Sequence, residues 1–145
     1  PALAQPVPAR VIDGDTLAIG DTRIRLYGID APENGQTCLD ATAAAYDCGA
    51  AATAALAEMT AGELVACEPR DTDRYGRTVA TCQAGGQDLA AALVASGVAV
   101  AYERYSRDYL PQQASARTAS RGLWAGRFAW PWAWRRDHDA PLSAH

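Results

Sequence analysis

Acidic and arginine residues that could act on a phosphodiester occur in three clusters along the chain. They are Asp13-Gly14-Asp15-Thr16, the segment from Arg25 through Asp30-Ala31-Pro32-Glu33, and Asp73-Arg74-Tyr75-Gly76-Arg77. Carboxylates can hold a divalent metal, arginines can hold a phosphate, and a glutamate can accept a proton. These are the groups that hydrolysis of a phosphodiester needs.

The first cluster favours a metal site. Asp13 and Asp15 are two residues apart, so on an extended chain their side chains point the same way. Like charges on one face are unfavourable without a cation nearby. With Asp30 as a third carboxylate and no clustered His or Cys, the donors indicate calcium or magnesium rather than a transition metal. The alternative for Asp13 is a turn-forming role in the Asp-Gly dipeptide.

The second cluster combines a strand arginine with a rigidly held glutamate. Arg25 lies between apolar neighbours and must face solvent or meet an anion. Arg25 and Asp30 are an odd number of residues apart, so a straight strand would place their side chains on opposite faces. We expect a bulge at Gly28 to bring both to one site. The alternative is a surface ion pair, which contributes little. Glu33 follows Pro32, whose fixed backbone suits a general base.

The third cluster adds groups that can bind a nucleotide. Arg77, with Arg25, could stabilise charge on the phosphoryl oxygens in the transition state. Tyr75 lies two residues before Arg77 and could stack on a base or bond a phosphate.

Length and charge bound the class of protein. The chain has 145 residues, one domain's worth, and no apolar run long enough to cross a membrane. Its net charge of −4 argues against a simple electrostatic nucleic-acid binder. The charge is uneven: residues 1–102 carry 6 Arg against 13 acidic residues, whereas residues 103–145 carry 7 Arg against 4. This basic end is either a solvated surface or a basic flank beside an acidic metal site.

Cysteine number and spacing predict disulfides. Four cysteines without a C-x-x-C spacing favour two bridges over zinc. Of the three possible pairings we favour Cys38–Cys48 and Cys67–Cys82, because each closes a local loop. With Ala2-Leu3-Ala4 resembling the end of a removed secretory signal, they indicate a secreted or periplasmic protein. The alternative is four buried thiols in a cytosolic protein.

Hydrophobic patterns predict an α+β fold. Strands are expected over 10–13, 16–19, 22–29, 63–68 and 78–83, with a polar loop over 34–47 and a short extended piece over 98–101. Helices are expected over 49–59, 88–96 and 109–120. A five-stranded barrel with three packed helices fits this order.

Taken together, the motifs resemble those of the thermonucleases, the staphylococcal nuclease family. The matching segments are I-D-G-D-T at 12–16, I-R-L-Y-G-I-D-A-P-E at 24–33, D-R-Y-G-R at 73–77 and D-L-A-A-A-L-V-A-S-G-V-A at 88–99. The resemblance covers about residues 9–125 and implies an OB-fold barrel with three helices. It also implies cleavage of DNA and RNA to leave 3′-phosphate ends.

The resemblance implies roles for the metal site. Asp15 and Asp30 correspond to direct Ca²⁺ ligands, and Ala31 to a ligand through its backbone carbonyl, where the family often has Thr. Asp13 corresponds to a residue that acts through water. Glu33 corresponds to the proposed general base.

It implies roles for the phosphate site as well. Arg25 and Arg77 correspond to the arginines that bind the phosphate and stabilise the transition state. Tyr75 resembles the nucleotide-contacting tyrosine, and Tyr102 corresponds to a second one.

Three features depart from the family pattern. The chain is acidic, whereas the best-known members are basic and rich in Lys. Cys38 and Cys48 staple a loop that is mobile in the type member. The segment 124–136 is rich in Trp and Arg, and its tryptophans either cover the barrel and third helix or form a stacking surface for bases.

The sequence therefore predicts a monomeric, calcium-dependent nuclease that acts on DNA and RNA, preferably single-stranded. The alternatives are a catalytically weak OB-type nucleic-acid-binding module and a phosphodiesterase for a small or unusual substrate. The nuclease domain is expected over 9–136, between tails at 1–8 and 137–145.

Overall fold

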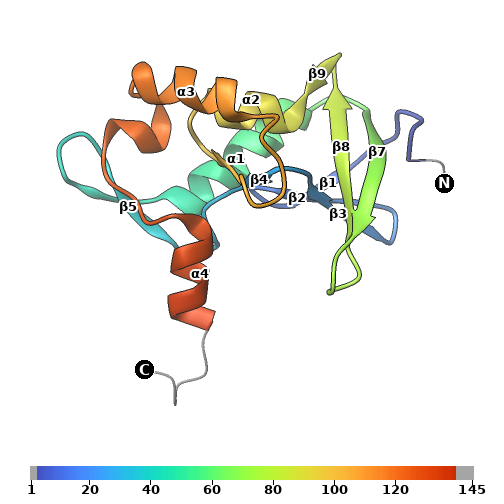
Figure 1. Ribbon diagram of the computed structural model, residues 1–145. Coiled ribbons are helices and arrows are strands. Elements are labelled where there is room, and N and C mark those ends of the chain that lie inside the picture. Colours follow the sequence, from blue (N-terminus) through green and yellow to red (C-terminus); the bar gives the residue numbers. More distant parts are fainter. Residues whose placement is uncertain (1–2, 140–145) are drawn as a thin grey trace.

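Short segments rich in Val, Ile, Leu and Thr form a curled sheet in the computed structural model, which describes residues 3–139 (Figure 1). The sheet has the order β1-β2-β3-β8-β7, with β9 paired to β8. Adjacent strands are antiparallel except for the parallel pair β3 and β8. The bounds are β1 Arg10–Asp13, β2 Thr16–Ile19, β3 Thr22–Leu26, β7 Val65–Thr72, β8 Thr78–Ala84 and β9 Gln87–Asp88. This is the α+β, OB-type arrangement that the sequence predicts.

The three expected helices are present, and a fourth follows them. Their bounds are α1 Cys48–Thr60, α2 Leu89–Ala95, α3 Leu110–Thr118 and α4 Pro131–Asp139, with a 3₁₀ turn, η1, at Gly122–Ala125. The side chain of Asp47 caps α1 and that of Asp88 caps α2. In Figure 1, α2 and α3 lie together, whereas α4 projects on the opposite side of the molecule. Pro131 begins α4, consistent with the tolerance of a helix's first turn for proline.

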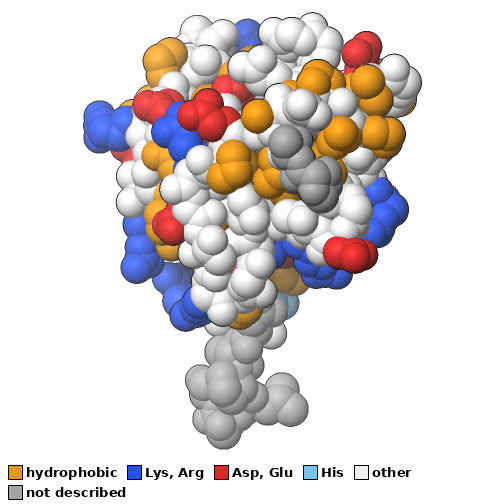
Figure 2. Space-filling view, turned by 90° about the vertical axis from the view of Figure 1, so that its right-hand side faces the viewer, with side chains coloured by type: hydrophobic (Ala, Val, Ile, Leu, Met, Phe, Trp, Pro, Cys, Tyr) orange, Lys and Arg blue, Asp and Glu red, His pale blue; other side chains and the backbone are white. Residues whose placement is uncertain are grey.

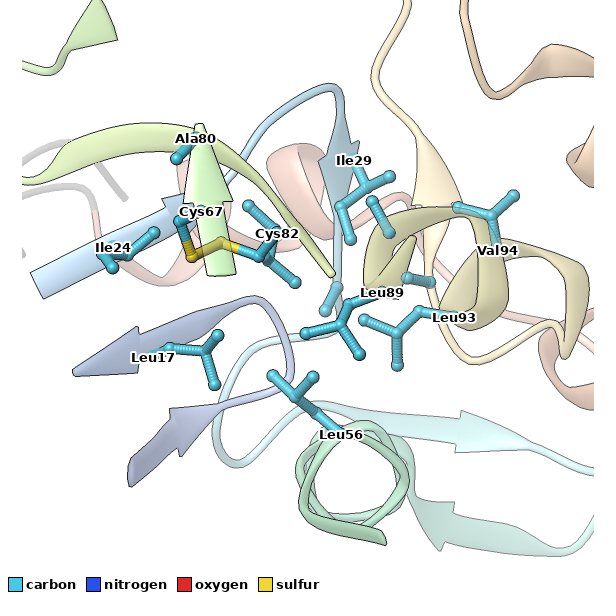
Figure 3. Packing of buried hydrophobic residues seen from close by; sticks show 14 of the residues in the cluster. Leu17, Ile24, Ile29, Leu56, Cys67, Ala80, Cys82, Leu89, Leu93 and Val94 are labelled. Atoms are coloured by element: carbon cyan, nitrogen blue, oxygen red, sulfur yellow. A yellow bond between two sulfur atoms is a disulfide. The ribbon is translucent and has the colours of Figure 1, made fainter. Parts of the chain in front are cut away.

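The core lies between the sheet and the helices. Leu17 and Ile24 of the sheet, Leu56 of α1 and Leu89 of α2 are fully buried and point toward one another (Figure 3). Burial of each such side chain contributes roughly 1.5–3 kcal/mol. This packing fixes α1 beneath the turn that joins β1 to β2, which matters for the site.

Both favoured disulfides are confirmed. Cys67 and Cys82 face each other across β7 and β8, and their bridge lies within the core (Figure 3). Cys38 and Cys48 are joined as well. Within residues 3–139, no helix has the length and apolar character of a membrane span.

Two segment predictions are wrong. The segment 22–29 is not one strand, because it breaks at Tyr27–Gly28 and continues as β4, Ile29–Asp30, which pairs with β10, Val100–Ala101. The segment 34–47 is not simply a polar loop. It contains a small hairpin of β5, Thr37–Leu39, and β6, Ala45–Asp47, which the Cys38–Cys48 bridge ties to α1.

Residues near both ends of the described part of the chain contact the domain. In the predicted N-terminal tail, Val7 pairs with Val65, and the carbonyl of Leu3 accepts a hydrogen bond from the backbone N–H of Cys67. At the other end, α4 continues to Asp139, and residues 140–145 of the predicted C-terminal tail lie outside the described residues.

Candidate active site

The turn between β1 and β2 positions two of the predicted carboxylates. The backbone is not extended here as predicted, since β1 ends at Asp13 and Gly14–Asp15 form a turn. The two side chains still lie close, because Asp13 Oδ1 accepts the Asp15 backbone N–H at 3.1 Å. A side chain on Gly14 would come within 2.6 Å of Ala52 in α1 and 2.9 Å of Ala31. Glycine therefore lets this turn approach both neighbours.

Arg25 and Asp30 come together as predicted, but through a break in the strand at Tyr27–Gly28 rather than through the predicted bulge. Gly28 has a φ of +80°, and a side chain there would meet Tyr109 at 2.9 Å. Arg25 Nη2 donates to Asp30 Oδ1 at 3.2 Å. The pair is buried rather than at the surface, because the Asp30 side chain is 0% exposed and that of Arg25 is 13% exposed.

Arg25 lies between two carboxylates. Its Nη1 is 2.9 Å from Asp15 Oδ2, and its Nη2 contacts Asp30. Nη1 is buried and has charge contact with Asp15, but its N–H groups have no aligned hydrogen-bond acceptor among the described residues. A buried N–H group of this kind can donate a hydrogen bond to an anionic oxygen of a ligand.

Negative charge accumulates around this arginine. Burial, reinforced by the charge of Asp15, raises the pKa of Asp13 to about 6. Burial and the same neighbour raise the pKa of Asp30 to about 6, although Arg25 opposes the shift. Burial also disfavours ionised Asp15, but Arg25 and the Ala31 N–H, which donates to Asp15 Oδ2 at 2.9 Å, outweigh it and lower its pKa. The site therefore favours a cation.

A buried glutamine holds the turn that carries Glu33. Gln36 Oε1 accepts the Glu33 N–H at 3.0 Å, and the Gln36 N–H donates to the Glu33 carbonyl at 2.9 Å. Gln36 Nε2 donates to the carbonyl of Ala129 at 2.9 Å, which links this turn to the segment before α4. The sequence patterns did not single out Gln36, because it is one polar residue in a polar segment.

Arg135 of α4 is a site residue that the sequence interpretation missed. It contacts Glu33 Oε1 through Nη1 and lies 3.1 Å from Asp30 Oδ2 through Nη2. Burial acts to lower the pKa of Arg135, but the hydrogen bonds to Asp30 and to Glu33 outweigh burial and raise the pKa above its usual value. The only signal in the sequence was the excess of arginine over acidic residues in 103–145, which does not single out one arginine.

Arg77 and Tyr75 lie apart from this group, in the turn between β7 and β8. Arg77 Nε donates to Asp73 Oδ2 at 2.7 Å, and its guanidinium lies 5.6 Å from the centre of the Tyr75 ring. The Tyr75 residue is 69% exposed. The parallel pairing of β3 with β8 places Ile24 opposite Thr78, so Arg77, immediately before the start of β8, lies beside the strand that carries Arg25.

Tyr102 lies next to the strand break. Its backbone N–H donates to the carbonyl of Gly28 at 2.9 Å. Its ring is stacked on that of Trp132, with centroids 4.8 Å apart and planes 8° apart. The C-terminal segment therefore covers one face of the predicted nucleotide-contacting tyrosine.

The residues present fit a hard divalent cation. Residues 3–139 contain no set of three or more His, Cys, Asp or Glu side chains that converges on a cation position. The carboxylates of Asp15 and Asp30 nevertheless converge on the guanidinium of Arg25. The backbone N–H of Ala31 donates a hydrogen bond to Asp15 Oδ2. Buried oxygen donors with excess negative charge suit Ca²⁺ completed by backbone oxygen and water.

Comparison with known proteins decides the family. A family profile described as "Staphylococcal nuclease homologue" matches residues 23–126. The chain belongs to the staphylococcal nuclease family. The match includes Arg25, Asp30, Glu33 and Arg77, and it ends before α4 and Arg135.

Curated relatives in the staphylococcal nuclease family have several names. The chain is 40% identical over 126 residues to "Succinoglycan biosynthesis protein ExoI" of Rhizobium meliloti (strain 1021), covering 83% of this chain and 66% of that protein. It is 37% identical over 134 residues to an "Uncharacterized endonuclease" of Escherichia coli O157:H7, covering 87% and 81%. It is 34% identical over 145 residues to "Micrococcal nuclease" of Shigella flexneri, covering 88% and 78%.

Proposed function

We propose that this staphylococcal nuclease family member is a calcium-dependent nuclease that hydrolyses phosphodiester bonds of DNA and RNA and leaves 3′-phosphate ends. The observation that carries the proposal is the buried Arg25, whose guanidinium contacts Asp15 through Nη1 and Asp30 through Nη2. A guanidinium donor beside carboxylates suits a phosphate oxygen held next to a cation. Two of the relatives have names that describe nucleases, which supports the same reaction.

In this proposal the carboxylates of Asp15 and Asp30 and the carbonyl of Ala31 hold the ion, and Asp13 acts through water. When bound, Ca²⁺ supplies positive charge that offsets the charge of the phosphate. Arg25 donates to a phosphoryl oxygen from its buried position and stabilises the charge that builds there during the reaction. Because Arg25 is fixed by two carboxylates, little reorganisation is needed at that moment.

Glu33 is the proposed general base, which accepts a proton from the attacking water. Its turn is held by Gln36, which limits how far the carboxylate can move. Arg135 contacts Glu33 Oε1 and therefore engages that oxygen. We propose that Arg135 balances the negative charge of Asp30 and Glu33, and that release of this contact would leave the Glu33 carboxylate free to accept the proton.

Arg77 and the tyrosines are proposed to bind the nucleotide. Arg77 would have to exchange Asp73 for a phosphoryl oxygen, in a turn whose residues 74–76 are exposed. Tyr75 is exposed and available to a base or a phosphate. Tyr102 would contact the nucleotide from beside Gly28.

Substrate form and compartment complete the proposal. Single strands are favoured because an acidic protein gathers a stiff duplex poorly, whereas a flexible strand can enter a local site. The two disulfides support a secreted or periplasmic protein. A monomer is the proposed working form.

Cleavage of single-stranded DNA with Ca²⁺ and with a chelator tests the enzyme. We expect cleavage with Ca²⁺, loss with chelator, recovery when Ca²⁺ is restored, and 3′-phosphate ends on the products. A panel with double-stranded DNA and RNA gives the preference. Absence of cleavage with Ca²⁺ across a broad pH range would contradict the enzyme proposal.

A phosphodiesterase for a small or unusual substrate is the second candidate. It is favoured by the net charge of −4 and by the relative whose name concerns succinoglycan biosynthesis. A small chromogenic phosphodiester that is turned over faster than any nucleic acid would identify this activity.

A further inference from the structure

A pocket outside the candidate active site lies between α3 and the segment that leads to α4. An open pocket of about 590 Å³ is lined by Arg117, Trp124, Gly126, Arg127, Phe128 and Trp130. Two arginines and three aromatic residues line it, and no acidic residue does. Arg127, Phe128 and Trp130 lie beyond the residues matched by the family profile, and the proposed mechanism uses none of the six.

The aromatic walls stand at steep angles to one another. The Trp124 and Phe128 rings are 5.0 Å apart at 89°, and the Phe128 and Trp130 rings are 5.5 Å apart at 86°. Trp124 and Phe128 also pack on a cluster that includes Cys38, which anchors them. Trp130 is 40% exposed, so part of its ring remains available to a ligand.

The arginines are available to an anion. Both Arg117 and Arg127 are exposed, and the guanidinium of Arg117 lies 5.5 Å from the centre of the Trp124 ring. Within residues 3–139, no carboxylate forms an ion pair with either arginine. On a protein with a net charge of −4, two uncompensated guanidinium groups beside aromatic rings favour a planar, anionic ligand.

A ladder of rings connects this pocket to the candidate active site. Trp130 is stacked on Trp132 with centroids 5.0 Å apart, and Trp132 is stacked on Tyr102 at 4.8 Å. Arg135, one turn of α4 after Trp132, reaches Asp30 and Glu33. Stacked rings therefore run from Trp130 in the pocket to Tyr102, beside the candidate active site.

We propose that this arginine–aromatic pocket is a second nucleic-acid subsite, which holds a base and a phosphate of the single strand being cleaved. Aromatic side chains beside a positively charged groove are the usual means of holding single strands without sequence preference. The inference rests on the proposed nuclease function and extends it to nucleotides away from the cleaved bond. It also assigns a role to the basic end of an acidic chain.

Affinity for strands of two lengths tests the subsite. We use the full chain carrying Glu33→Gln, with Ca²⁺, and titrate it with an oligothymidylate of about 20 nucleotides and with thymidine 3′,5′-bisphosphate. Arg127→Ala and Trp130→Ala should each weaken binding of the oligonucleotide by about 5- to 100-fold, the range of one lost base contact. The affinity gap between the two ligands should narrow by the same factor. Arg107→Ala, whose side chain is 78% exposed on another segment, is the matched control and should change neither affinity.

The outcomes separate the subsite from the enzyme. Oligonucleotide affinity unchanged in both variants would overturn the subsite and leave the pocket to another occupant, such as a protein segment. An equal loss for both ligands would also overturn it, since the change would then act through the active site. Cleavage by the unmodified protein is scored separately, so failure of the nuclease proposal is recognised even where the pocket binds the strand.

Discussion

Charged side chains meet around Asp30, and their signs determine what the site binds. Arg25 contacts Oδ1 of this buried carboxylate, Arg135 contacts both of its oxygens, and Arg135 also contacts Glu33. Arg25 is held by Asp15 as well, so its place is fixed. The side chain of Arg135 is 32% exposed, whereas that of Arg25 is 13% exposed, so Arg135 is the guanidinium that is more easily displaced.

Replacement of Arg135 by glutamine should strengthen calcium binding. The substitution removes a positive charge that competes for Asp30 and Glu33, and we expect a rise in affinity of about tenfold, equivalent to about 1.4 kcal/mol. Isothermal titration without nucleotide measures it. Arg136→Gln is the matched control, because its side chain lies on the same helix and is 73% exposed. Unchanged or weaker binding by Arg135→Gln would show that this arginine does not compete with the ion.

Replacement of Glu33, the proposed general base, or of Arg77, the second proposed phosphate-binding arginine, should reduce turnover and preserve the fold. We expect Glu33→Gln to lower kcat by about 10²–10⁴-fold. Arg77→Ala should lower it by about 10²–10³-fold. Arg10→Ala, at an exposed position of β1, is the control for Arg77. Initial rates on single-stranded DNA and thermal melting are measured together, and a variant with normal turnover removes its residue from the mechanism.

At the scale of elements, α1 positions the turn that carries Glu33. Gly49 is buried in the first turn of α1, and a side chain there would overlap the carbonyl oxygen of Glu33. The Cys38–Cys48 bridge fixes the start of the same helix. Helix and turn are thus in contact at a place where no side chain fits between them.

Gly49→Ala should therefore damage activity more than stability. The added methyl group must displace the Glu33 backbone, and a shift of about 1 Å in a catalytic group costs about 10²-fold in rate. Overpacking costs about 1–3 kcal/mol. Ala50→Gly, at an exposed position of the same turn, costs about 1 kcal/mol and leaves Glu33 untouched. If both variants lose activity in proportion to stability, α1 does not position Glu33.

Elements with local signals could be predicted from the sequence, whereas contacts between distant segments could not. The strands near Asp13 and the helix after Asp88 have strong hydrophobic and capping patterns, and both formed. Arg25 and Asp30 would lie on opposite faces of a straight strand. Gly28 between them indicated an irregular backbone that could bring the two side chains together. By contrast, Arg135 reaches Asp30 across 105 positions of sequence, and no local pattern encodes that approach.

At the scale of the whole molecule, positive charge is in excess only in residues 103–145, which carry 7 Arg against 4 acidic residues, whereas residues 1–102 carry 6 Arg against 13. Acidic and arginine side chains are interspersed on the face that carries β7 and β8 (Figure 2). The site and the pocket, by contrast, each place a few arginines where a phosphate would lie. Substrate binding should therefore depend on a small number of phosphate contacts rather than on a broad basic surface.

The salt dependence of binding measures that number. For single strands, the logarithm of the binding constant falls with the logarithm of salt concentration by about 0.7 for each phosphate contact. Contacts from Arg25, Arg77, Arg117 and Arg127 then give a slope of about −3. Fluorescence anisotropy with Glu33→Gln at constant Ca²⁺ and varied KCl supplies the slope. A slope steeper than about −6 would indicate a broad basic surface, and loss of about 0.7 from the slope in Arg127→Ala would assign one contact to the pocket.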